Sequence, residues 1–213
     1  MMLRSLRGLL TGIALAAYAA ASAHAEVPPD VLVKNVTLEV VEIIAKDKDL
    51  RAGDRKKVID LVEAKVLPHF SFSSMTALAM GQHWPKASAE QKKRLTEEFR
   101  TLLVRTYASA LAAYSDQKFD FRPLRARPSD TDVTVQVRVL QPGAQPISID
   151  YGMEKTACGW KTYDVAVGGV SLVVNYRSEF SNQVREVGVD GLIRNLQAKN
   201  VALASGDAEA GKR

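Results

Sequence analysis

The chain has 213 residues, of which 46% are hydrophobic and 25% charged, with a formal net charge of +5. No Lys/Arg stripe is interleaved with aromatic residues, so we expect no nucleic-acid binding. Cys158 is the only cysteine, which excludes an internal disulfide bond and leaves stability to packing.

The first 25 residues are organised as a secretory signal peptide. Arg4 and Arg7 precede an apolar run from Leu9 to Ala21, and Ala-His-Ala ends at Ala25. The run is about 13 residues, shorter than the roughly 20 that span a membrane, which argues against an anchor. We therefore expect cleavage after Ala25 and a mature chain with a net charge of +3.

The first half of the mature chain is predicted to be helical, because apolar residues recur at intervals of three and four. One helix is expected over residues 31–46 with Asp30 as its cap. A second is expected after Asp54 and should end at Pro68. A shorter helix should follow within residues 69–85.

The longest helix is expected to begin after Ser88, because Ser88 and Gln91 have the spacing of a capping box. Its apolar residues recur every three or four positions from Leu95 to Tyr114 and share one face. The helix should be about 40 Å long.

After Asp116 the apolar period changes from 3.6 to 2. Four strands are expected, at residues 119–127, 133–139, 147–154 and 160–167. In the last of them, Tyr163, Val165 and Val167 should share the apolar face. Alternation of this kind is typical of an antiparallel sheet with one dry and one wet face.

Two closing helices are expected, over residues 178–187 and 190–203, and residues 205–213 should be a disordered tail. The fold class is therefore α+β, in a single domain over residues 26–204. A curved four-stranded antiparallel sheet should pack against a helical half that includes one long helix. Such an NTF2-like or cystatin-like cone would enclose an apolar floor, either a plain core or a ligand pocket.

No residue combination predicts catalysis. The stretch from Gly169 to Val173 lacks the second glycine of a nucleophile elbow, so Ser171 is expected to be a turn or capping hydroxyl. Asp164 lies beside Tyr163 and is expected to make a surface or loop-pinning hydrogen bond. We predict a non-enzyme without a metal or cofactor, since two mature histidines make a poor zinc site.

Two other functional classes would make different demands on the sequence. A small isomerase or dehydratase on a cone-like scaffold would act on an apolar substrate, and it would need an inward-facing Asp/His or Asp/Tyr pair. A lipoprotein carrier would need many more strands than four.

Three motifs resemble the signature of the MlaC family, also called the toluene-tolerance family. They are WKTYDV at residues 160–165, GVSLV at 169–173 and NYRSEF at 175–180. Residues 81–111 and 188–200 also resemble the family's central segment and its C-terminal helix. The resemblance covers nearly the whole mature chain.

The resemblance implies a monomeric periplasmic carrier of the Mla phospholipid-transport pathway, which maintains outer-membrane lipid asymmetry. Its implied partners are phospholipid, the MCE-domain subunit of an inner-membrane ABC transporter and an outer-membrane lipoprotein complex. Acyl chains would fill the pocket. Arg177 would either lie at its mouth near the head group or form an ordinary surface salt bridge. The residues expected to line the pocket are Leu67, Phe70, Met75, Leu78, Phe99, Leu103, Tyr107, Leu111, Val137, Val139, Ile149, Tyr151, Val165, Val167, Val170 and Val173.

Overall fold

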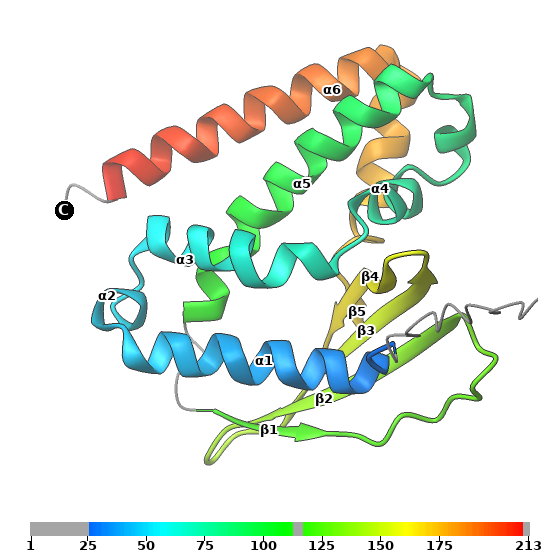
Figure 1. Cartoon of the computed structure of the whole chain (residues 1–213). Helices are drawn as coiled ribbons and strands as arrows, with labels where there is room; N and C mark the ends of the chain where they lie inside the picture. Colours follow the sequence, from blue (N-terminus) through cyan, green and yellow to red (C-terminus); the bar gives the residue numbers. More distant parts are fainter. Residues whose placement is uncertain (1–25, 113–116, 211–213) are drawn as a thin grey trace, which may run out of the picture.

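The computed structural model describes residues 26–112 and 117–210, so the predicted signal peptide lies outside it. The described part combines helices with one antiparallel sheet, which confirms the α+β class. Figure 1 shows α1 laid across the sheet, with α5 and α6 forming a layer farther from it. No helix in this part is both long and apolar enough to cross a membrane.

The helices follow the predicted order with changed boundaries. They are α1 (Pro29–Lys46), α2 (Lys48–Arg51), α3 (Arg55–Leu61), the π-helical η1 (Val62–Val66), the 3-10 turn η2 (Leu67–His69), α4 (Phe72–Met80), the 3-10 segment η3 (Gly81–Lys86), α5 (Ala89–Ala112) and α6 (Tyr176–Ala210).

Of the two N-caps predicted for α1 and α3, one is wrong and one is confirmed. Pro28 occupies the N-cap of α1 and Asp30 lies in its first turn, so the predicted Asp30 cap is wrong. The Asp54 side chain does cap α3, accepting a hydrogen bond from the Lys57 N–H at 3.0 Å. The helical path continues through η1 and η2 and ends at His69, which confirms the predicted stop at Pro68 to within one residue. Pro68 lies near the start of η2, where a missing N–H costs little.

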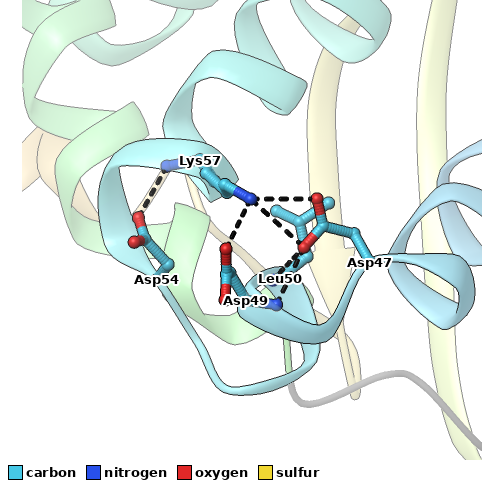
Figure 2. A network of polar contacts seen from close by, with 5 residues as sticks. All are labelled: Asp47, Asp49, Leu50, Asp54 and Lys57. Atoms are coloured by element: carbon cyan, nitrogen blue, oxygen red, sulfur yellow. Dashed lines mark hydrogen bonds and ion pairs between the residues drawn. The ribbon is translucent and has the colours of Figure 1, made fainter.

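A polar corner joins the end of α1 to α3 (Figure 2). Asp47 Oδ1 accepts hydrogen bonds from the N–H groups of Asp49 and Leu50, at 2.8 and 3.1 Å. Lys57 Nζ contacts Asp49 Oδ2 at 2.6 Å and Asp47 Oδ2 at 3.1 Å. The Leu50 N–H and the Lys57 side chain hold the pKa of the Asp47 carboxyl below its ordinary value. This corner therefore fixes the turn between α1 and the α3–η1 segment.

The predicted capping box of α5 is confirmed. The Gln91 N–H donates to Ser88 Oγ at 3.1 Å, and the Ser88 N–H donates to Gln91 Oε1 at 3.0 Å. Apolar residues of α4, α5 and α6 form the largest core, which we call the helical core. A smaller cluster joins α1, α2, α3 and α5, and a third lies under the sheet.

The closing helical segment breaks where two helices were expected to meet. Gly188 has a non-helical backbone, with φ 71° and ψ 177°, within α6. The helix then continues to Ala210, past its predicted end at residue 203 and into the segment expected to be a disordered tail. The last three residues lie outside the described part of the chain.

The sheet has five strands rather than four, in the order β1-β2-β3-β4-β5. They are β1 (Lys118–Phe121), β2 (Asp132–Leu140), β3 (Ile147–Thr156), β4 (Gly159–Val167) and β5 (Val170–Ser171). The strand expected to reach Arg127 ends at Phe121, because Pro123 cannot donate to a ladder. The fifth strand follows Gly168 and Gly169, whose positive φ angles of 59° and 84° suit a two-residue hairpin turn.

A β-bulge in β4 changes the predicted alternation. Gly152 pairs with Asp164 and Met153 pairs with Thr162, so Tyr163 has no partner in β3. The extra residue interrupts the alternation, so side chains on either side of the bulge no longer follow one inward–outward pattern. The prediction that Tyr163 shares the apolar face with the valines of β4 is therefore wrong.

Tyr163 instead lies against the outer face of the sheet. A Cβ atom at Gly152 would come within 3.2 Å of the Tyr163 ring, so the glycine makes room for it. The Tyr163 hydroxyl donates to Asp132 Oδ1 at 3.1 Å. Partial burial and this carboxylate raise the pKa of Tyr163 to about 12.

Candidate ligand-binding cavity

A cavity of about 450 Å³ lies between α1, the η1–η2 segment, α5 and the inner face of the sheet. This volume is within the range of about 300–1,000 Å³ that small-molecule sites occupy. Hydrocarbon side chains make up most of its wall. The lining residues are Leu32, Val33, Val36, Thr37, Val40, Val41, Ile44, Val62, Val66, Leu67, His69, Phe70, Phe72, Met75, Leu103, Val104, Tyr107, Ala108, Ala110, Phe119, Ile149, Tyr151, Met153, Thr162, Val165, Val167 and Leu172.

Local periodicity accounts for each part of this wall. The α1 residues are spaced by three or four, so they share one face of the helix. Ile149, Tyr151 and Met153 alternate along β3 and point to the same side. Val62 and Val66 mark the two ends of the π-helical segment η1, whose wider turn is typical of functional sites.

The structure brings nine of the sixteen predicted pocket residues together in the cavity wall. They come from η2 and the residue that follows it, from α4 and α5, and from strands β3 and β4. These residues are Leu67, Phe70, Met75, Leu103, Tyr107, Ile149, Tyr151, Val165 and Val167.

Three predicted pocket residues belong to the helical core instead. Phe99 packs edge-on against Phe180 and against Tyr176, with ring centroids 5.1 Å apart in both pairs. Val173 is fully buried in the same core, and Leu78 packs against it. All three side chains point toward the interior as predicted, but residues of α6 lie opposite them and fill the space.

The remaining four predicted residues have other environments. Val137 and Val139 of β2 are at most 1% exposed and do not line the cavity. Val170 lies beyond the Gly168–Gly169 turn and is 52% exposed. The side chain of Leu111 lies outside the described part of the chain.

Arg177 joins two helices rather than lining the cavity. Its Nε and Nη2 atoms donate to the Leu78 carbonyl oxygen, at 3.1 and 2.9 Å. The carbonyl belongs to the last turn of α4, where helical acceptors lack partners. Arg177 thus ties the start of α6 to the end of α4.

The α1 wall is the main feature that the sequence analysis missed. Its helical spacing was visible, but nothing local distinguishes a stripe that faces a void from one that packs in a core. Thr162 lines the cavity because the bulge interrupts the alternation of β4, and no sequence pattern predicted that bulge. His69, for which no role in binding was predicted, also lines the cavity.

Few polar groups line the cavity. Burial and the positive charge of Lys161 lower the pKa of His69, while Glu39 opposes them, so the imidazole is neutral at pH 7. Tyr107 also lines the cavity, and burial and contact with Tyr107 raise the pKa of Tyr176 in the helical core to about 12. Among the described residues, no group of three or more His, Cys, Asp or Glu could hold a metal ion.

Ser171 and Asp164 form a hydrogen bond that fixes the loop between β4 and α6. Ser171 Oγ donates to Asp164 Oδ1 at 2.7 Å and accepts a hydrogen bond from the Val174 N–H at 2.9 Å. Asp164 Oδ1 also accepts from the Val165 N–H at 2.8 Å. The hydroxyl therefore contacts a carboxylate rather than an imidazole base, as expected for a turn residue.

Comparison with known proteins gives consistent matches. A family model described as "MlaC protein" matches residues 34–198. The intermembrane phospholipid transport system binding protein MlaC of Haemophilus influenzae is 24% identical over 192 residues, which cover 89% of this chain and 90% of the relative. The toluene tolerance protein ttg2D of Pseudomonas putida is 25% identical over 185 residues, covering 86% of this chain and 84% of the relative.

A solved structure is also similar. It is the phospholipid-binding protein from Ralstonia solanacearum in complex with a phospholipid, 38% identical in sequence with a TM-score of 0.75. The match covers 82% of this chain and 98% of that chain.

Proposed function

The chain belongs to the MlaC family, and from this premise we propose that it carries phospholipid, with acyl chains in the cavity between α1, η1–η2, α5 and the sheet. The observation that carries the proposal is the cavity's hydrocarbon wall, to which α1 alone contributes seven residues. The related protein from Ralstonia solanacearum was solved with a phospholipid bound.

The energetics of exposed hydrocarbon support a carrier. A phospholipid has about 30 methylene groups, and burying each contributes about 0.8 kcal/mol, so exposing both chains costs on the order of 25 kcal/mol. A barrier of that size corresponds to roughly one escape in days. Such a carrier would retain its lipid while surrounded by water and would release it only on contact with an acceptor.

We propose that the carrier works in the periplasm, between an outer-membrane lipoprotein complex and the MCE-domain subunit of an inner-membrane ABC transporter. The signal-like first 25 residues support export. The relative from Haemophilus influenzae is named for an intermembrane phospholipid transport system, which supports transfer between membranes.

We propose a carrier rather than an isomerase or dehydratase. Asp164 and Ser171 bind each other in a loop, and Tyr163 lies on the outer face against Asp132. The Asp/Tyr pair that the enzymatic alternative would need in the cavity is thus engaged elsewhere.

Lipid extraction tests the proposal. The exported protein is purified without detergent and extracted with organic solvent. Mass spectrometry identifies the extracted lipid, and a phosphate assay measures its amount relative to protein. We expect phospholipid close to equimolar with protein. Folded protein that carries no phospholipid and takes up none from vesicles would overturn the carrier function and direct attention to enzyme assays.

A further inference from the structure

At one end of the cavity, the helical half of the protein is bonded directly to the sheet. The Ser71 N–H donates to the Thr162 carbonyl oxygen at 2.8 Å, and Phe70 forms a parallel bridge with Thr162. Ser74 Oγ donates to Glu154 Oε1 at 2.5 Å. These contacts hold the segment that leads from η2 into α4 against β3 and β4, close to the hairpin that joins the two strands.

Burial along these strands shows which end of the cavity is deepest. Met153 and Thr162 form a cross-strand pair near the hairpin, line the cavity and are 0% and 3% exposed. Ile149 and Val167 form the corresponding pair at the far end of the strands, where they line the cavity but are only half-buried. Val170, in the turn just beyond Val167, is 52% exposed. We call the Met153–Thr162 pair the closed end and the Ile149–Val167 pair the open end.

Met153 has packed side chains behind it and the void in front. It belongs to the apolar cluster under the sheet, together with Val33, Val133 and Trp160. Val33 and Met153 line the cavity, whereas Val133 and Trp160 do not. A hydrocarbon chain that enters at the open end therefore reaches Met153 last.

We propose that Met153 and Thr162 form an end stop for the acyl chain and thereby limit the chain length that the protein accepts. The end stop rests on the proposed phospholipid carrier. The methyl end of the chain lies against Met153, and the head group stays in water beyond the open end. A chain longer than the cavity leaves its surplus methylene groups in water. Each such group weakens relative binding about fourfold, which corresponds to about 0.8 kcal/mol.

Lipids that differ only in chain length test the end stop. The exported protein is incubated with vesicles that contain equal parts of dipalmitoleoyl-, dioleoyl- and dieicosenoyl-phosphatidylglycerol, and the lipid bound after re-isolation is measured by mass spectrometry. Met153→Ala should raise the bound ratio of the longest to the shortest lipid at least about fourfold, because the lost thioether makes room for a further methylene group. The control is Met80→Ala, the same change at a helical-core position that does not line the cavity, and it should leave the ratio unchanged.

The outcomes separate the two proposals. If Met153→Ala leaves the ratio unchanged, or if Met80→Ala raises it equally, the end stop fails while the carrier function stands. If the wild-type protein takes up none of the three lipids, both fail.

The methionine methyl groups give a second readout, which decides the question even if Met153→Ala does not fold. Of the five methionines, Met1 and Met2 lie in the predicted signal peptide, which leaves Met75, Met80 and Met153. Phosphatidylglycerol is prepared with a nitroxide at the methyl end or near the carboxyl end of one acyl chain, and NMR compares the broadening of each methionine methyl signal with that for unlabelled lipid. The label at the methyl end should broaden Met153 more than the label near the carboxyl end does. The reverse order would place the head group at the closed end and overturn the end stop.

Discussion

Leu102 and Leu103 are consecutive residues of α5 that face different surroundings. Leu102 is fully buried in the helical core, whereas Leu103 also borders the cavity. One residue turns an α-helix by about 100°. The helix α5 thus separates a close-packed region from a void.

Truncating these two leucines should have unequal costs. Leu102→Ala should lower the free energy of unfolding by about 3–5 kcal/mol, because it opens a new void in a packed core. Leu103→Ala should lower it by only about 2 kcal/mol, mainly the lost transfer energy, because the removed atoms already border a void. Urea denaturation of lipid-free protein measures both. Equal losses would show that the space beside Leu103 is filled when no lipid is bound.

Filling the cavity from α1 should displace cargo. Val36→Trp places a large ring where Val36 lines the wall. Displacing about two methylene groups of lipid costs about 1.6 kcal/mol, so phospholipid binding should fall at least about tenfold. The control is Leu38→Trp in the same helix, where the side chain is 45% exposed. Equal retention of lipid by both variants would place the acyl chains elsewhere.

Removing the Ser171 hydroxyl should affect stability and not binding. Ser171→Ala should lower the free energy of unfolding by about 1–2 kcal/mol, because Asp164 and the Val174 N–H both lose a partner. Ser178→Ala, at an exposed position of α6, provides the baseline. Thermal or urea unfolding gives the difference, and lipid extraction should find unchanged cargo. A loss no greater than that of Ser178→Ala would contradict the loop-holding role.

Acid should weaken the protein through His69. Burial and Lys161 lower its folded-state pKa, so near pH 6 the unfolded chain binds more protons than the folded one. The contribution is fully present above the ordinary histidine pKa of about 6.5, and it is lost as pH falls through the folded-state value. Wild-type protein should therefore lose more stability between about pH 7.5 and pH 5.5 than His69→Gln does. Parallel pH profiles for the wild-type protein and His69→Gln would contradict the prediction.

Elements set by interactions within a few residues were predictable. The Ser88–Gln91 capping box, the Asp54 cap and the alternation of β2 all occur where expected. Each depends on backbone groups that must find partners close by in the chain. The turn at Gly168 and Gly169 is equally local, because both residues have positive φ angles.

The bulge at Tyr163 was not predictable from alternation. Its position depends on the pairing of β3 with β4 and on the space above Gly152, which takes the ring. The partner of Arg177 was hidden for the same reason, since the Leu78 carbonyl is 99 residues away in the chain.

The sequence by itself determined which segments are helix or strand and which face of each is apolar, because side-chain periodicity and capping are local. Only the tertiary structure decided that the apolar face of α1 borders a cavity while Phe99 packs in a core. A void and a core need the same hydrocarbon side chains. The difference between them depends on whether another element fills the space opposite, as α6 does for Phe99 and nothing described does for Val36.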